Sequence, residues 1–211
     1  IVTKVRRAGL KITPRQLFEC QTISALAQKA VPVEANDPAA LQFNLIDDVA
    51  PIALLPVQQD FFVQPVPMRS HWNQAVLLKC REKLHAGYLR EALIAALQQH
   101  RALRFRFHED AKGEWRQTAD SGSEHDYLWI RQAADQEQFL VICNAAQRSL
   151  NLQQGLLLRV VLIDWADGTQ RLLLVIHHTV IDGVSWRIVV EDLETAYRQA
   201  ARQQDIDLPA V

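Results

Sequence analysis

Cysteine and glycine are scarce in this sequence, and both shortages exclude classes of site. The 211 residues contain three cysteines and seven glycines. Cys20, Cys80 and Cys143 are odd in number and far apart, so neither a disulfide framework nor the spacing of a metal site is present. We expect reduced thiols and a cytoplasmic location. No G-x-S-x-G sequence marks a serine hydrolase, and Gly183 stands too isolated to form a phosphate-binding loop.

Long apolar runs and a strong net charge are also missing. No stretch of about 18 apolar residues exists to span a bilayer, and the first residues, Ile-Val-Thr-Lys-Val-Arg-Arg, lack the apolar core of a signal peptide. The net charge of −1 gives no reason to expect a nucleic acid or an anionic membrane as partner. Since the first residue is not methionine and already lies in a helical pattern, we expect the chain to be a segment of a longer one.

The composition supports a packed core, and the charge pattern divides the chain. With 49% hydrophobic and 22% charged residues, wholesale disorder is excluded. Residues 1–30 carry six basic side chains against Glu19 alone, whereas the remainder is net acidic. Residues 31–50 contain two prolines and four acids, which is typical of a linker. We therefore expect three parts: residues 1–30, a linker at 31–50, and a larger domain at 51–211.

Residues 1–30 read as short helices. Residues 1–9 resemble the tail of a helix that Gly9 ends. Thr13-Pro14-Arg15-Gln16 is a helix start with a capping box, and Thr22 can cap another helix. Three short helices do not bury enough surface to fold alone.

Residues 51–211 alternate between helical and strand patterns. Apolar periodicity predicts helices near 54–62, 86–100, 134–147 and 185–203. Alternation predicts strands near 71–81, 103–108, 114–119, 126–131, 156–164 and 170–176, with a hairpin turn at Ala166-Asp167-Gly168. In the first of these strands Trp72, Gln74, Val76, Leu78 and Cys80 share one side. The mixture predicts an α+β fold: a mostly antiparallel sheet flanked by helices.

The motif whose side chains could take part in a reaction is His177-His178-Thr-Val-Ile-Asp182-Gly183, at the end of an apolar strand. Neighbouring strand residues point to opposite faces, so the two histidines have different surroundings. A histidine there can transfer a proton near neutral pH. Asp182 is either a base or a structural anchor, and Gly183 permits a tight turn into the following helix. Adjacent histidines on a strand are badly aimed for one metal ion, and histidines beside a strand are more often structural than catalytic.

Four segments in order resemble the condensation-domain superfamily of nonribosomal peptide synthetases. They are Leu54 to Gln59, His100 to Phe107, Ser149 to Arg159, and the histidine motif. The resemblance implies a chloramphenicol-acetyltransferase-like lobe, the first of two, with the active site between them. It implies that His178 carries the chemistry, that His177 is packed, and that Asp182 is structural and paired with Arg104. The resemblance also implies that the active site holds no metal ion.

Three details resemble the epimerization type of this superfamily. They are Gly183 to Leu193 with Ser185-Trp186, His71-Trp72-Asn73-Gln74, and Gln58 to Phe62, where the family usually has a tryptophan near Phe61. Residues 1–30 resemble the C-terminal part of a peptidyl carrier domain. The resemblance implies 4′-phosphopantetheine on a serine upstream of Ile1, inversion at the α-carbon of a carrier-bound thioester, and a second lobe that supplies a glutamate. We expect these 211 residues alone to be inactive.

Three other functions stay open at this point. A condensation domain would form an amide between two carrier-bound substrates. A coenzyme-A-dependent acyltransferase would lack the carrier-like residues 1–30. A degenerate docking lobe would lack some of His178, Asp182, Gly183 and Arg104, all of which are present.

Overall fold

The computed structural model describes residues 5, 10–20, 22–32, 52–119 and 125–209. The chain divides into two compact units, Ile1–Ile46 and Asp47–Val211. Each unit is described by itself below.

Two short capped helices lie in the described part of the first unit. Helix α2 (Pro14–Glu19) begins with the expected capping box, because Thr13 accepts from the Gln16 N–H and the Gln16 side chain accepts from the Thr13 N–H. Thr22 caps helix α3 (Ile23–Lys29) by accepting from the Ala25 N–H. Strands β1 (Leu10–Lys11) and β2 (Val31–Pro32) pair antiparallel, which the helical pattern of the sequence did not indicate. Most of the predicted helix tail at 1–9 and most of the predicted linker at 31–50 lie outside the described residues.

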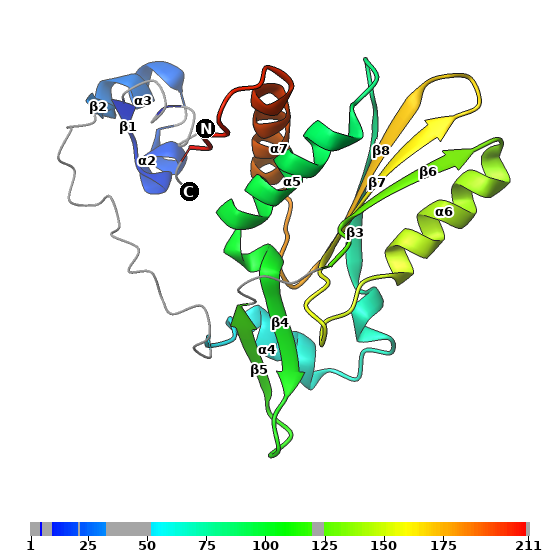
Figure 1. Cartoon of the computed structure of the whole chain (residues 1–211). Helices are drawn as coiled ribbons and strands as arrows, with labels where there is room; N and C mark the ends of the chain where they lie inside the picture. Colours follow the sequence, from blue (N-terminus) through cyan, green and yellow to red (C-terminus); the bar gives the residue numbers. More distant parts are fainter. Residues whose placement is uncertain (1–4, 6–9, 21, 33–51, 120–124, 210–211) are drawn as a thin grey trace. The chain divides into compact units, whose positions relative to one another are not determined.

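The second unit is a mixed α and β domain (Figure 1). Its helices are α4 (Pro56–Val63), α5 (Ala86–Gln99), α6 (Gln136–Arg148) and α7 (Ser185–Ala201), with 3₁₀ turns η1 (Arg69–His71) and η2 (Arg101–Arg104). Its strands are β3 (Asn73–Lys79), β4 (Phe105–Glu109), β5 (Trp115–Ala119), β6 (Leu128–Ala133), β7 (Leu158–Trp165) and β8 (Gln170–His177).

Four strands form the main sheet, in the order β3-β8-β7-β6. The β3–β8 and β7–β8 pairs are antiparallel, and the β6–β7 pair is parallel. The expected antiparallel-dominated sheet is therefore confirmed, with one parallel pair at its β6 edge. The β7–β8 hairpin turns at Gly168, whose φ of 79° suits glycine.

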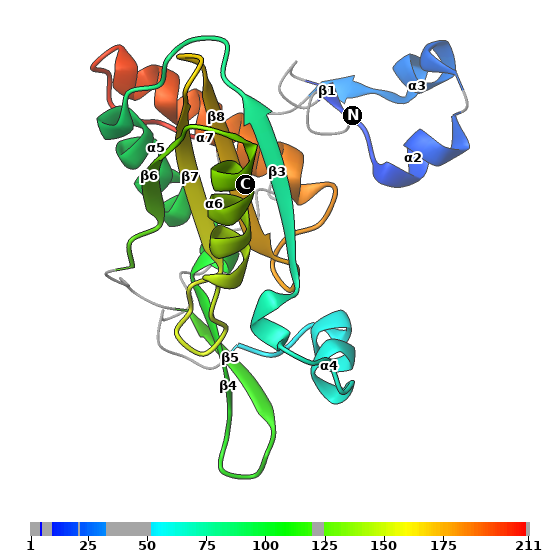
Figure 2. The same cartoon turned by 90° about the vertical axis from the view of Figure 1, so that its right-hand side faces the viewer.

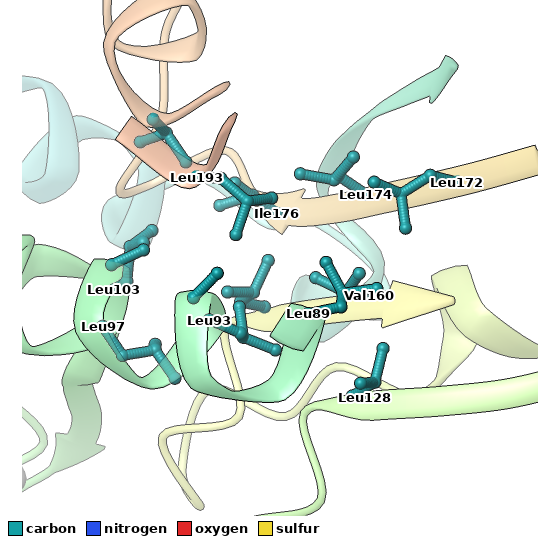
Figure 3. Close-up of a cluster of buried hydrophobic side chains, with 14 of the residues drawn as sticks. Leu89, Leu93, Leu97, Leu103, Leu128, Val160, Leu172, Leu174, Ile176 and Leu193 are labelled. Atoms are coloured by element: carbon teal, nitrogen blue, oxygen red, sulfur yellow. The ribbon is translucent and has the colours of Figure 1, made fainter. Parts of the chain in front are cut away.

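Helices cover both faces of this sheet. Helices α5 and α7 lie side by side on one face and α6 lies on the other (Figures 1 and 2). Since strand residues alternate, one set of β8 side chains faces α5 and α7, and the other faces α6. The first set belongs to the larger apolar core, which Figure 3 shows between α5, α7 and the strands: Leu172, Leu174 and Ile176, with Leu89, Leu93, Val160 and Leu193. Leu173 and Val175 belong to the smaller core beside α6.

Strands β4 and β5 form a separate antiparallel hairpin, which extends beyond the main sheet with α4 near it (Figures 1 and 2). Phe62 of α4 stacks on Trp115 of β5, with ring centroids 4.3 Å apart. The sequence predicted strands near 114–119 and 126–131, and the structure separates them: β5 pairs with β4, whereas β6 joins the main sheet. No helix of the described residues is long and apolar enough to cross a membrane.

Candidate active site

The two adjacent histidines occupy opposite environments at the end of β8. His177 is fully buried, whereas His178 is exposed. His178 still continues the β3–β8 ladder, because its backbone N–H donates to the Trp72 carbonyl at 2.9 Å. Strand alternation turns its side chain to the face that carries Ile176, and that of His177 to the opposite face.

His177 is held on both ring nitrogens. Its Nε2 lies 2.8 Å from the Arg69 carbonyl oxygen, and its Nδ1 lies 2.8 Å from the Thr179 hydroxyl and 3.2 Å from the Thr179 backbone N–H. A carbonyl can only accept, so Nε2 carries the proton and Nδ1 accepts. The ring of Phe61 lies against it edge-on, with centroids 5.9 Å apart.

Burial makes His177 a poor group for proton transfer. Desolvation disfavours the charged imidazolium and lowers the pKa of His177 from 6.5 to about 4, although its hydrogen bond to Arg69 acts in the opposite direction. The side chain therefore stays neutral around pH 7. Gln58 supports the same region, because its buried amide donates to the Thr179 carbonyl at 3.0 Å and accepts from the Leu55 N–H at 2.8 Å.

His178 has the opposite protonation pattern. Its Nδ1 lies 2.8 Å from the Ile181 carbonyl oxygen, so Nδ1 carries the proton. Its Nε2 lies 3.2 Å from Nε2 of Gln74, an amide nitrogen that can only donate. Nε2 of His178 is therefore the unprotonated, basic nitrogen. A neutral imidazole with an exposed side chain and one basic nitrogen can take a proton from a bound substrate.

Asp182 stabilises the turn that leads into α7. One oxygen of its carboxylate accepts from the Val184 and Ser185 N–H groups at 3.0 and 2.7 Å and from the Ser185 hydroxyl at 2.7 Å. Its backbone carbonyl accepts from the Trp186 N–H at 3.0 Å. The hydrogen bonds from Ser185 lower the pKa of the Asp182 carboxyl below its usual range. The carboxylate therefore uses these hydrogen bonds to stabilise the start of α7.

The expected ion pair between Arg104 and Asp182 is not among the contacts of the described residues. Asp182 is exposed, and the Val184 and Ser185 N–H groups stabilise its charge. Arg104, half-buried in η2, donates from Nε to the Leu97 carbonyl at 2.9 Å. The structure therefore gives these two residues different partners.

The local backbone does not require glycine at position 183. Positive φ angles occur at Gly113, Gly155 and Gly168, and not at Gly183, among the described residues. A Cβ built on Gly183 would meet no atom within 4 Å. The chain does turn at residues 183 and 184 before α7, but this turn does not need the positive φ that favours glycine. Gly183 instead leaves open space three residues before Trp186.

The sequence did not identify the contacts that fix the histidines. Gln74 and Trp186 stood out only as points of family resemblance, and the structure brings Gln74 to His178 and Trp186 to Gln74. Strand alternation placed Gln74 on one side of β3, but only the β3–β8 register brings it near the motif. Among the described residues, no group of three or more His, Cys, Asp or Glu side chains is arranged to hold a metal ion.

The fold and this motif correspond to a known family: residues 50–211 match the condensation domain, and the chain belongs to that family. The resemblance to the condensation-domain superfamily of nonribosomal peptide synthetases is thereby confirmed. One component of the linear gramicidin synthase of Brevibacillus parabrevis is 43% identical over 216 residues, which cover 99% of this chain and 4% of that protein. Tyrocidine synthase 2 of the same organism is 33% identical over 214 residues, which cover 99% of this chain and 6% of that protein.

Two solved structures have the same fold. The epimerization domain from the third module of tyrocidine synthetase B is 34% identical with a TM-score of 0.71, covering 77% of this chain and 38% of that one. The first condensation domain of the calcium-dependent antibiotic synthetase is 19% identical with a TM-score of 0.67, covering 76% and 40%. This chain thus spans well under half of each solved domain and a small part of each curated relative.

Proposed function

We propose that this chain is the N-terminal lobe of an epimerization domain. In that role it inverts the α-carbon of an aminoacyl or peptidyl thioester bound to a carrier domain. The main support is the 34% identity to an epimerization domain, against 19% to a condensation domain of the same fold. Among the residues that resemble epimerases, Gln74 lies 3.2 Å from His178, and Trp186 donates to Gln74.

We propose residues 1–30 as the C-terminal part of a peptidyl carrier domain, 31–50 as a linker, and 51–211 as the lobe. The 4′-phosphopantetheine arm would reside on the carrier, upstream of Ile1, and would deliver the thioester. The surroundings of His178 fit such an approach, because His178 and Gly183 are exposed and the space at Gly183 is open. The arm supplies the thioester whose carbonyl acidifies the α-hydrogen.

In the proposed reaction, Nε2 of His178 accepts the α-proton. The Cα–H bond breaks, and its electron pair enters the thioester carbonyl as an enolate. The Nδ1–H bond to Ile181 holds the ring while the charge develops. A second acid on the opposite face then returns a proton to Cα, which gives the inverted centre. We assign that acid to the second lobe, as the family resemblance implies.

Isotope exchange separates this reaction from condensation. The complete two-lobe domain is incubated with its carrier, loaded with an α-deuterated aminoacyl thioester, together with a loaded downstream carrier. We expect loss of deuterium from Cα and formation of both enantiomers, with no amide. An amide product without exchange at Cα would identify a condensation domain instead.

A further inference from the structure

The side chain of Gln74, on β3, contacts both His178 at the end of β8 and Trp186 on α7. It lies on β3, opposite Ile176 of β8, and points to the same face as His178. Its Nε2 lies 3.2 Å from Nε2 of His178, and its Oε1 lies 2.7 Å from Nε1 of Trp186 on α7. Trp186 also packs against the main core, so its indole has a fixed position.

Trp186 determines which end of the Gln74 amide faces the histidine. An indole N–H can only donate, so the amide oxygen must face Trp186. The amide NH₂ must then face His178. On the other side of the ring, the Ile181 carbonyl, 2.8 Å from Nδ1, can only accept. Hydrogen bonds therefore run in one direction, from Trp186 to Gln74, then to His178 and Ile181.

We propose that Gln74 is a positioning residue that keeps the catalytic nitrogen of His178 unprotonated and correctly oriented, and that Trp186 fixes the Gln74 amide for this task. This rests on the proposed function of His178. If the amide were rotated by 180°, its oxygen would face Nε2 and would favour a proton there. The amide contact at 3.2 Å is at the long end for a hydrogen bond, so a substrate can displace it at small cost.

The replacement Gln74→Glu tests this proposal with almost no change in shape. One carboxylate oxygen still accepts from Trp186, but the other now presents an acceptor to Nε2 of His178. In the 211-residue chain at pH 8, ¹⁵N NMR of the wild type should show a protonated Nδ1 and an unprotonated Nε2 for His178. In Gln74→Glu, the Nε2 resonance should become that of a protonated nitrogen.

Two further variants serve as comparison and control. Trp186→Phe removes the indole N–H, so the amide can rotate, and a fraction of His178 should acquire a proton on Nε2. Gln138→Glu adds the same negative charge on α6. There Oε1 of Gln138 accepts a hydrogen bond from the Ala134 N–H, and a carboxylate oxygen can accept the same bond. It should leave the His178 resonances unchanged. An unprotonated Nε2 in both Gln74→Glu and Trp186→Phe would overturn the proposal, whatever reaction the domain catalyses.

The kinetic effect is measured separately in the complete two-lobe domain with its loaded carrier. Gln74→Glu should lower kcat for Cα exchange by about 100-fold, because general-base catalysis contributes roughly that much, with little change in KM. Gln74→Met, which removes both hydrogen bonds and keeps the length, should lose less. Normal kcat in Gln74→Glu alongside a protonated Nε2 would overturn the catalytic role of this contact. If His178→Ala also kept full activity, the proposed function itself would fail.

Discussion

His177 and His178 are neighbours in sequence, yet their imidazoles carry their protons on opposite nitrogens. His177 donates from Nε2 to Arg69 and is buried, whereas His178 donates from Nδ1 to Ile181 and is exposed. The alternation of a strand separates their faces, and one backbone carbonyl per ring selects the tautomer. Two identical side chains thus lie in different surroundings, one buried and one exposed, and we propose proton transfer only for the exposed one.

The largest effect should come from His178→Ala in the complete domain. We expect Cα exchange to fall by about 10²–10⁴-fold, the usual contribution of a positioned general base. Because the side chain is exposed, the melting temperature should stay close to that of the wild type. Exchange is followed by deuterium loss and stability by circular dichroism. Exchange at the wild-type rate would contradict our assignment of the base.

His177→Ala should instead destabilise the second unit. The change removes a buried ring and leaves the Arg69 carbonyl and the Thr179 N–H without their partner. Such losses cost about 3 kcal/mol together. Urea unfolding measures the difference, with His178→Ala as the matched control, expected within about 0.5 kcal/mol of the wild type. Equal losses in the two variants would remove the distinction between the histidines.

The pH dependence of stability should come from His177. Its pKa is about 4 in the folded protein and 6.5 in its ordinary state. The unfolded chain therefore binds more protons between these values, and stability falls as pH decreases through this window. We expect a loss of about 2 kcal/mol between pH 7 and pH 5.

The matched variant for this pH effect is His177→Asn, which cannot titrate. Urea unfolding at pH 7 and pH 5 measures how much stability each protein loses between these values. The loss in His177→Asn should be about 2 kcal/mol smaller than the loss in the wild type. Identical pH slopes in both proteins would show that other groups cause the effect.

The smallest effect concerns Asp182, which lies four residues beyond His178. Asp182→Ala removes the acceptor of the Val184 and Ser185 N–H groups and should cost about 1 kcal/mol, whereas Asp182→Asn retains an accepting oxygen and should cost less. A double-mutant cycle with Arg104→Met should give a coupling energy below about 0.5 kcal/mol, because the bonds to Asp182 come from the neighbouring residues Val184 and Ser185. A coupling above about 1 kcal/mol would restore the ion pair that the sequence led us to expect.

Local patterns predicted much of this arrangement. Apolar periodicity located α5 and α7, and the Gly168 turn located the β7–β8 hairpin. Alternation at the end of β8 was enough to predict that the two histidines face different surroundings. These features depend on residues close in sequence, where spacing carries the information.

Other features depend on contacts that spacing does not encode. The pairing of Asp182 with Arg104 was implied by the family resemblance, and a contact between a loop residue and η2 depends on the tertiary fold. The contact of Gln74 with His178 requires the register between two strands about 100 residues apart. The parallel β6–β7 pair likewise depends on how α6 crosses between these strands.

The position of β3 has a consequence for the order of folding. Strands β7 and β8 join through a short turn and can form a hairpin early, whereas β3 reaches β8 only after a long loop has closed. His178 obtains its contact with Gln74 in that late step, across a separation of 104 residues. During synthesis, Gln74 leaves the ribosome long before Trp186, and the amide is oriented only when the start of α7 has emerged. Nε2 of His178 therefore gains an oriented amide partner only after the chain has been made as far as Trp186.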